Sequence, residues 1–109
     1  MVYTGTHDNE TLLSWFRDIS PLERRQVREY LNDFHSSEQE ICQNLICLVM
    51  RSVAKLCVIP MQDYLYLDNS ARMNQPSTLG KNWKWRLVPG QFTEALQKEM
   101  KALAKRYGR

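Results

Sequence analysis

The residues best suited to chemistry in this chain form a histidine–aspartate–asparagine triplet near its N-terminus. His7, Asp8 and Asn9 follow a short β-prone segment, residues 1–4, that ends at Gly5. Together they offer a carboxylate beside side chains that form hydrogen bonds, which is the kind of set that recognises neighbouring hydroxyls of a sugar. A simpler interpretation stays open, because a helix is expected directly afterwards and Asp8 or Asn9 would cap its first amides.

A second candidate segment runs from Met61 to Arg86. It is predicted to be irregular from residue 63 to residue 85, because Asn, Gly, Pro and Ser recur along it, and long ordered loops of this kind are often functional. Trp83 and Trp85 alternate within it. They are expected either to stack on sugars or to pack against the rest of the protein, and packing is the favoured interpretation.

Two strands are expected to place these candidate segments. The first is the segment 1–4, and the second is the apolar, β-branched run Leu56–Ile59, which Pro60 ends. A continuous run of this type is typical of a strand in a parallel sheet covered by helices. The predicted order of strand, helices, strand, loop and helix is a βαβα unit, and active-site residues of α/β barrels gather where such strands end. Two strands do not close a barrel, so the sheet is expected to continue elsewhere.

Four helices are predicted around these strands. The clearest follows Ser20, because Pro21 at the first helical position and Glu23 two residues later complete a capping box. Its expected apolar face holds Val27, Tyr30, Leu31 and Phe34. The other helices are predicted at residues 10–16, 37–53 and 93–107, and some of the apolar faces are wide enough to need a partner.

Composition indicates one small globular domain spanning residues 1–109. The chain is 43% hydrophobic and 25% charged, and its formal net charge of +3 is too small to indicate a dedicated nucleic-acid binder. Its longest apolar stretch, Leu45–Met50, is far too short to cross a membrane, and no secretory signal is visible. Cys42, Cys47 and Cys57 have no metal-ligand spacing, so buried free thiols in a reducing cytoplasm are expected.

Four sequence blocks resemble those of the amylomaltases, the 4-α-glucanotransferases also called disproportionating enzymes. The blocks occur in the family's order at Tyr3–Asn9, Pro60–Asp63, Ala71–Pro76 and Asn82–Arg86. Together they make a specific match, whereas the triplet alone would be a weak one. Three positions depart from the family's pattern, because Ser14, Ser77 and Lys81 stand where it has glycine or a Gly-like residue. The last two departures lie in the segment that carries Asn74.

The resemblance implies the fold and chemistry of a retaining (β/α)₈ barrel that transfers α-1,4-glucan segments between chains. Retaining enzymes use a carboxylate nucleophile and a carboxylic acid/base that are about 5–5.5 Å apart. In this family a third carboxylate stabilises the transition state, and that role falls to Asp8. His7 is expected to bind hydroxyls of the same sugar, and Asn74 to contact the glucan. No metal or organic cofactor is implied.

The family's nucleophile and acid/base blocks are both missing from this sequence. The chain is therefore expected to be the C-terminal part of the barrel, about strands seven and eight with their helices, and to be inactive alone. Exposed strand edges predict that the isolated chain self-associates. One rival interpretation is a free-standing helical interaction module without catalysis. A weaker rival is a nucleic-acid-binding domain, supported only by Arg24, Arg25, Arg28 and the basic tail.

Overall fold

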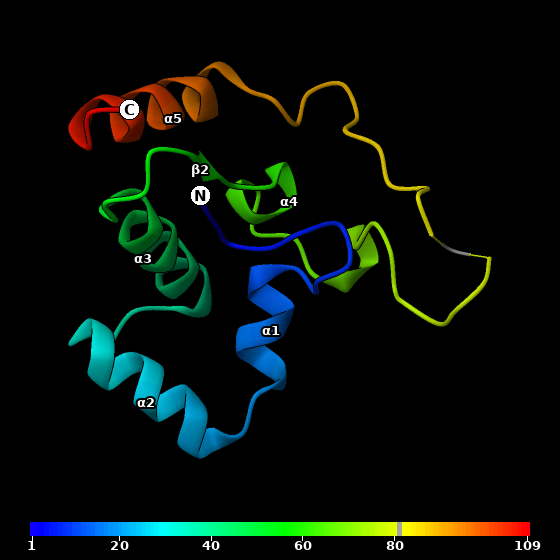
Figure 1. Cartoon of the computed structure of the whole chain (residues 1–109), viewed down its shortest axis with the longest axis horizontal. Coiled ribbons are helices and arrows are strands. Elements are labelled where there is room, and N and C mark those ends of the chain that lie inside the picture. The colour runs from blue at the N-terminus through cyan, green and yellow to red at the C-terminus, as the bar shows by residue number, and fades with distance from the viewer. Residues whose placement is uncertain (81) are drawn as a thin grey trace.

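The computed structural model describes residues 1–80 and 82–109, which form a mostly helical unit around two short strands (Figure 1). In chain order the elements are β1 (Val2–Tyr3), α1 (Leu12–Asp18), α2 (Pro21–Leu31), α3 (Glu38–Met50), β2 (Cys57–Val58), α4 (Met61–Tyr64), the 3₁₀ turn η1 (Asn69–Ala71) and α5 (Glu94–Arg106). No helix within the described part of the chain is long and apolar enough to cross a membrane.

The two strands pair in parallel, which confirms the predicted strand–helix–strand unit. Val2 lies opposite Cys57 and Tyr3 opposite Val58. The pairing continues at both ends, where Val2 N donates to the carbonyl of Leu56 at 2.8 Å and Thr4 N to that of Val58 at 3.3 Å. Each strand has two residues rather than the four expected. Only one edge of each strand is hydrogen-bonded to another strand in the described part of the chain.

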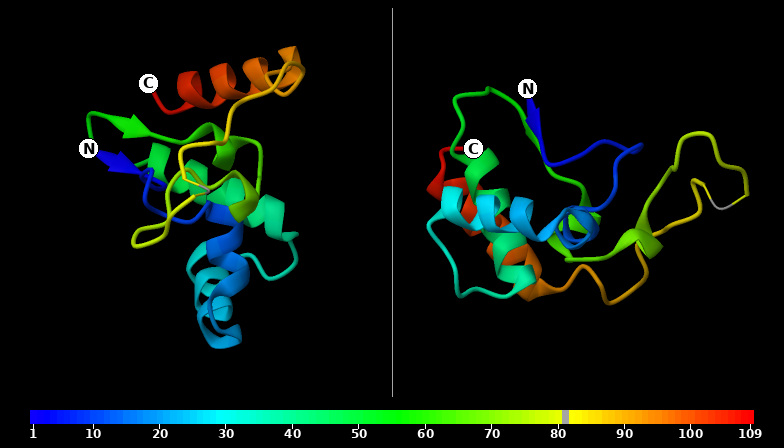
Figure 2. Two further views of the ribbon diagram at one scale, coloured as in Figure 1. Left: turned by 90° about the vertical axis from the view of Figure 1, so that its right-hand side faces the viewer. Right: turned by 90° about the horizontal axis from the view of Figure 1, so that it is seen from below.

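Helices α1 and α3 pack against each other and form the core. Phe16, Ile41, Cys42 and Ile46 are almost completely buried, and Leu103 of α5 packs into the cluster that includes Cys42 and Ile46. Helix α3 lies between α2 and α5 in Figure 1, and the left view of Figure 2 shows the same arrangement. The strands lie beside this helical core, and the loop that leaves β1 leads into α1.

Helix α2 confirms the capping-box prediction but buries none of its residues. The Ser20 hydroxyl accepts from Glu23 N at 3.1 Å, and Ser20 N donates to the Glu23 carboxylate at 3.5 Å. The predicted apolar face is mostly uncovered, with Tyr30 78% exposed and Phe34 52% exposed. This face therefore contributes little to the core of the described chain.

The capping role of Asp8 or Asn9 was a wrong prediction. Helix α1 begins at Leu12, and Thr11 is its N-cap. The Asn9 side chain instead accepts two hydrogen bonds from Thr6, one from the backbone at 2.7 Å and one from the hydroxyl at 2.9 Å. Asn9 thus closes its own turn, and Asp8 is free of any capping role.

The segment predicted to be irregular, residues 63–85, includes the end of α4 and all of η1, which is a second difference from the sequence-based expectation. Asp68 starts η1 by accepting from Ser70 N at 2.9 Å. Both elements are very short, and a helix of one turn leaves no periodic pattern in a sequence. Helix α5 begins and ends close to the predicted positions, with Thr93 as its N-cap.

The three cysteines are free thiols, and only Cys42 is fully buried. Cys47 and Cys57 are half-buried, so the expectation of three buried thiols is correct for one of them. Burial raises the pKa of the Cys42 thiol to about 12.

Candidate active site

The loop that leaves β1 carries the triplet, and residues 5–11 are called here the triplet loop. It brings His7 and Asp8 to Asn74, which lies 66 residues further along the chain from Asp8. Asn74 Nδ2 donates a hydrogen bond to Asp8 Oδ1 at 2.5 Å. His7 Nε2 lies 3.3 Å from the same oxygen. The three residues predicted to form a site therefore do form one cluster.

Arg72 joins the two segments that carry this cluster. Its Nη2 donates to the backbone carbonyl of Asp8 at 2.7 Å, and its Nε donates to that of Asn74 at 3.0 Å. A planar guanidinium presents several donors in a fixed geometry, which suits it to holding two carbonyls at once. Sequence reasoning did not assign Arg72 a role, although it belongs to the Ala71–Pro76 block.

Asp63 is a second residue whose place in the site was missed. Its side chain is buried, with 3% of its surface exposed, directly after β2. Its Oδ2 accepts from the Thr4 hydroxyl at 2.6 Å, and its Oδ1 accepts from Leu12 N at 2.8 Å. Desolvation raises the pKa of this carboxyl, and the two hydrogen bonds partly oppose that rise. The only sequence signal was its position at the end of the Pro60–Asp63 block.

Asn69 also forms hydrogen bonds with residues at the beginning of α1. Its side-chain oxygen accepts from Thr11 N at 3.2 Å, and its amide donates to Glu10 at 3.2 Å. Asn69 N also donates to the hydroxyl of Ser14 at 2.8 Å. Ser14 stands where the resemblance predicts a Gly-like residue, and its hydroxyl forms a partly buried hydrogen bond that a glycine lacks.

The tryptophans of the second segment lie near His7 rather than in the core. Trp83 is 51% exposed, and its ring centroid is 5.0 Å from that of His7, with the two planes tilted by 36°. Trp85 is half-buried and lines a cavity beside the triplet loop. Trp83 is therefore not a core residue, although its ring packs against His7, as the favoured packing interpretation allows.

The backbone conformation at Ser77 explains why a glycine, which the resemblance predicts here, suits this position. Its φ of 65° lies in the left-handed region, which costs a residue with a side chain roughly 1–2 kcal/mol more than it costs glycine. Asn74 nevertheless reaches Asp8 in this chain. The departure at Lys81 lies outside the described residues.

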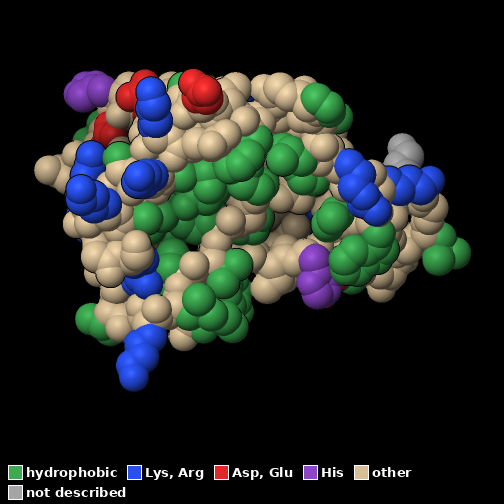
Figure 3. All heavy atoms as spheres, turned by 90° about the horizontal axis from the view of Figure 1, so that it is seen from above, with side chains coloured by type: hydrophobic (Ala, Val, Ile, Leu, Met, Phe, Trp, Pro, Cys, Tyr) green, Lys and Arg blue, Asp and Glu red, His purple; other side chains and the backbone are tan. Residues whose placement is uncertain are grey.

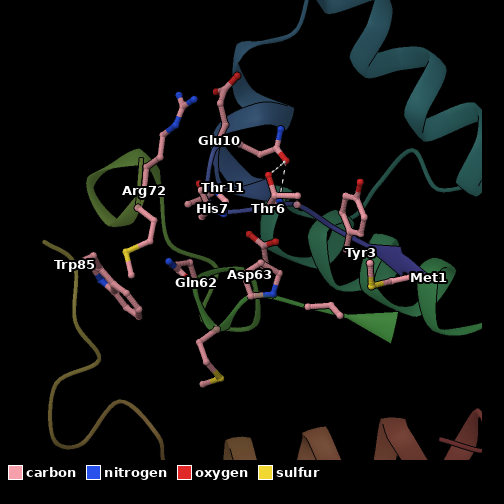
Figure 4. Close-up of a pocket in the computed structure, with 16 residues that line it drawn as sticks. Met1, Tyr3, Thr6, His7, Glu10, Thr11, Gln62, Asp63, Arg72 and Trp85 are labelled. Carbon is pink, nitrogen blue, oxygen red and sulfur yellow. Dashed lines mark hydrogen bonds between the residues drawn. The ribbon is translucent and has the colours of Figure 1, made fainter. Parts of the chain in front are cut away.

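Two cavities, each of about 510 Å³, flank the triplet loop. One is lined by the polar residues His7, Thr6, Gln62, Asp63 and Arg72, with Trp85 beside Gln62 (Figure 4). The other contains Asp8 beside apolar side chains of α1 and α3, namely Trp15, Leu45, Leu48 and Val49. The imidazole and the carboxylate of the triplet line two adjoining cavities, which share lining residues of the triplet loop and Arg72, and the two side chains approach each other to 3.3 Å.

The described residues contain no group of three or more His, Cys, Asp or Glu side chains placed to hold a metal ion. The polar groups that the loop does present are a carboxylate, an imidazole, an amide and a guanidinium. This set can bind and orient hydroxyl groups, and the carboxylate of Asp8 can stabilise a positive charge on a bound molecule.

A parallel strand pair with polar side chains clustered where both strands end is the arrangement of active sites in α/β enzymes. The chain belongs to the 4-alpha-glucanotransferase family, whose sequence model matches residues 1–92. This confirms the resemblance seen in the four sequence blocks.

Individual relatives agree with this assignment. The chain is 43% identical over 107 residues to the 4-alpha-glucanotransferase of Thermus thermophilus, which covers 95% of this chain and 21% of the relative. It is 41% identical over 103 residues to the chloroplastic/amyloplastic 4-alpha-glucanotransferase of Solanum tuberosum. This match covers 94% of this chain and 18% of that relative. The chain spans about a fifth of the length of these curated relatives.

The fold also matches a solved relative. An amylomaltase from Streptococcus agalactiae in complex with acarbose superimposes with a TM-score of 0.90 and 28% sequence identity, over 99% of this chain and 22% of that protein. The expected fold is thereby confirmed as that of one part of an amylomaltase, mostly helical with two parallel strands.

Proposed function

We propose that this chain forms the C-terminal part, about strands seven and eight, of the catalytic barrel of a 4-α-glucanotransferase. Such an enzyme transfers α-1,4-glucan segments between oligosaccharides with retention of configuration. The observation that supports this most strongly is the cluster of His7, Asp8 and Asn74 where the two strands end. The acarbose complex of the structural relative supports an oligosaccharide as the substrate.

In this proposal Asp8 stabilises the positively charged transition state, and His7 binds hydroxyls of the same sugar. Asn74 and His7 both approach Oδ1 of Asp8, whereas Oδ2 accepts no hydrogen bond from the described residues. This second oxygen is available to a sugar hydroxyl or to the developing charge at the anomeric carbon. Asn74 would contact the glucan from the opposite segment.

The remaining carboxyl groups of the site are poorly placed to act as a nucleophile or an acid/base. Both oxygens of Asp63 accept hydrogen bonds within the protein, and the side chain is buried. Glu10 accepts from Asn69. Retaining transfer requires two carboxyl groups that act on opposite sides of the bond. The isolated chain is therefore proposed to be inactive, and the missing pair would come from the rest of the barrel.

Replacement of the matched segment in a full-length relative tests this function. The barrel chimera is the Thermus thermophilus relative in which this chain replaces the matched 107 residues. The chimera should convert maltotriose into shorter and longer glucans, and the isolated chain should not. Asp8→Asn should lower kcat on the order of 10²–10³-fold, whereas Asp18→Asn, a change of an exposed aspartate at the end of α1, should not. An Asp8→Asn chimera with full activity would contradict the proposal.

Self-association of the isolated chain belongs to the same proposal. Helix α2 exposes apolar side chains, with Leu22 65% and Tyr30 78% exposed, and a separate broad band of hydrophobic side chains crosses the face shown in Figure 3, which is the side of the molecule on which α5 lies. Surfaces of this kind tend to pair with copies of themselves. Sedimentation across a range of concentrations should show species heavier than 12.9 kDa, and a monomer at all concentrations would contradict this.

The rival function, a free-standing interaction module, makes a different prediction. The chimera would then be inactive although folded, and the isolated chain would form one oligomer of fixed size.

A cytoplasmic location is also part of the proposal, and the three free thiols support a reducing compartment.

A further inference from the structure

We infer that Asp63 is a positioning residue that fixes both ends of the triplet loop, and that catalysis by Asp8 depends on it. The inference rests on the proposed function of Asp8. Asp63 is not itself assigned a catalytic role, because both of its oxygens accept hydrogen bonds within the protein, although its side chain lines the cavity beside His7 (Figure 4).

The two hydrogen bonds of Asp63 fix the distance between the two ends of the triplet loop. Thr4 immediately precedes the loop and donates its hydroxyl to Oδ2 at 2.6 Å. Leu12 immediately follows the loop and donates its backbone N–H to Oδ1 at 2.8 Å. One carboxylate therefore holds both ends within hydrogen-bond distance of itself, and the chain between them must close over a short span.

The position of Asp63 is in turn set by the second strand. Asp63 lies in α4, directly after β2, and its backbone N–H donates to the carbonyl of Pro60 at 3.0 Å. The loop after β1 is thus placed by a residue that belongs to the end of β2. A carboxylate suits this role because it accepts two hydrogen bonds at once, whereas Ala would leave Leu12 N without its partner in a buried site.

Hydrogen exchange distinguishes two possible roles of Asp63, which are positioning of the triplet loop alone and stabilisation of the whole fold. Local opening exposes only the amides of the loop to hydrogen exchange, whereas global unfolding exposes those of the core as well. The relevant comparison is between residues 5–12 and helix α3, which supplies the buried residues Ile41, Cys42 and Ile46. Hydrogen exchange requires no enzymatic activity, so it reports on Asp63 even if the proposed function is wrong.

The test uses Thr4 variants of the barrel chimera, because Val keeps the shape of Thr and removes only the hydroxyl. Thr4→Val should lower kcat about tenfold or more and change KM less than about twofold, since misplacement of a catalytic group acts mainly on the transition state. Thr4→Ser retains the hydroxyl and should keep kcat within about threefold. Thr93→Val removes the capping hydroxyl of the distant helix α5 and serves as the matched control.

Hydrogen exchange completes the test. Thr4→Val should accelerate exchange in residues 5–12 about tenfold while leaving α3 unchanged, and Thr93→Val should affect neither region. If Thr4→Val does not fold, Asp63→Asn replaces it. The Asn amide can accept from Leu12 N and donate to the Thr4 oxygen, so exchange in residues 5–12 should stay within about threefold of the parent.

Several results would overturn the inference. One is a Thr4→Val chimera that matches its parent in both kcat and exchange. A second is faster exchange in residues 5–12 and in α3 alike, for Thr4→Val or for Asp63→Asn, which would show a purely structural role. Failure of the proposed function has another signature, which is full activity of the Asp8→Asn chimera whatever the exchange data show.

Discussion

The side-chain amide of Asn74 donates a hydrogen bond to the carboxylate of Asp8, with Nδ2 2.5 Å from Oδ1 and 66 residues between them in the chain. The contact links the loop after β1 to the segment after β2. It leaves one carboxylate oxygen of Asp8 without a partner among the described residues, and in the proposed function this oxygen accepts from a hydroxyl of the bound sugar.

Asn74→Ala in the barrel chimera should lower kcat/KM about tenfold, because Oδ1 of Asp8 loses its donor and the glucan loses a contact. Asn44→Ala is the matched control, since Asn44 donates to the carboxylate of Asp33 at 3.0 Å, away from the site. Steady-state kinetics on maltotriose distinguish the two variants. Equal losses in both would show that the effect is general destabilisation.

Arg72→Lys should lower kcat about tenfold, because an ammonium group cannot hold the carbonyls of Asp8 and Asn74 in the geometry of a guanidinium. Arg24→Lys is a close control. Its guanidinium donates to the carbonyls of Arg17 and Ile19 at 2.7 and 2.9 Å, between α1 and α2. Activity that survives Arg72→Lys as well as it survives Arg24→Lys would refute a special role of Arg72.

His7→Asn should raise KM for malto-oligosaccharides and lower kcat/KM by about tenfold, because hydrogen bonds to the bound sugar are lost. His35→Asn changes the other histidine of the chain, which is exposed between α2 and α3, and should leave both constants unchanged. Kinetics over a range of chain lengths provide the measurement. An unchanged KM in His7→Asn would exclude His7 as a sugar-binding residue.

The raised pKa of Asp63 predicts a pH-dependent stability. A carboxyl whose pKa is higher in the folded than in the unfolded state stabilises the fold most below the unfolded pKa of about 3.9. That contribution is lost as the pH rises through the folded pKa. Relative to Asp63→Asn, the wild-type chain should therefore gain free energy of unfolding as the pH falls from 7 toward 4. Urea unfolding at several pH values measures the difference, and a constant difference would contradict the shift.

The buried thiol offers a test of the core. Cys42 is fully buried with a pKa of about 12, so it should resist alkylation at pH 8, while the half-buried Cys47 and Cys57 react faster. Peptide mapping after native labelling measures the order of reaction. Equal labelling of all three cysteines in urea is the control, and early labelling of Cys42 in the native protein would contradict the described packing.

The sequence was most informative where local chemistry decides the structure. The capping box at Ser20 and Glu23 satisfies helix amides within four residues, so α2 could be predicted without knowledge of the rest of the fold. The sequence also pointed to His7, Asp8 and Asn74 as candidate residues, and the structure brings them together, because both segments follow strands of one parallel sheet.

Contacts between distant segments could not be predicted in the same way. The start of α1 depends on Asp63 and Asn69, which lie 51 and 58 residues beyond the amides they accept from, so Asp8 and Asn9 were wrongly expected to cap it. Arg72 acts on backbone carbonyls, which every residue carries and no sequence pattern marks. The short elements α4 and η1 were missed for another reason, because a single helical turn leaves no periodic pattern in a sequence.

The central claim is that Asp8 and His7 contact one sugar ring of a bound glucan, and a crystal structure of the barrel chimera soaked with maltotetraose tests it most directly. The account predicts a glucose ring whose hydroxyls lie about 2.7–3.2 Å from Oδ2 of Asp8 and from the imidazole of His7. A glucan bound elsewhere in the barrel, with neither residue within hydrogen-bond distance of it, would contradict the account.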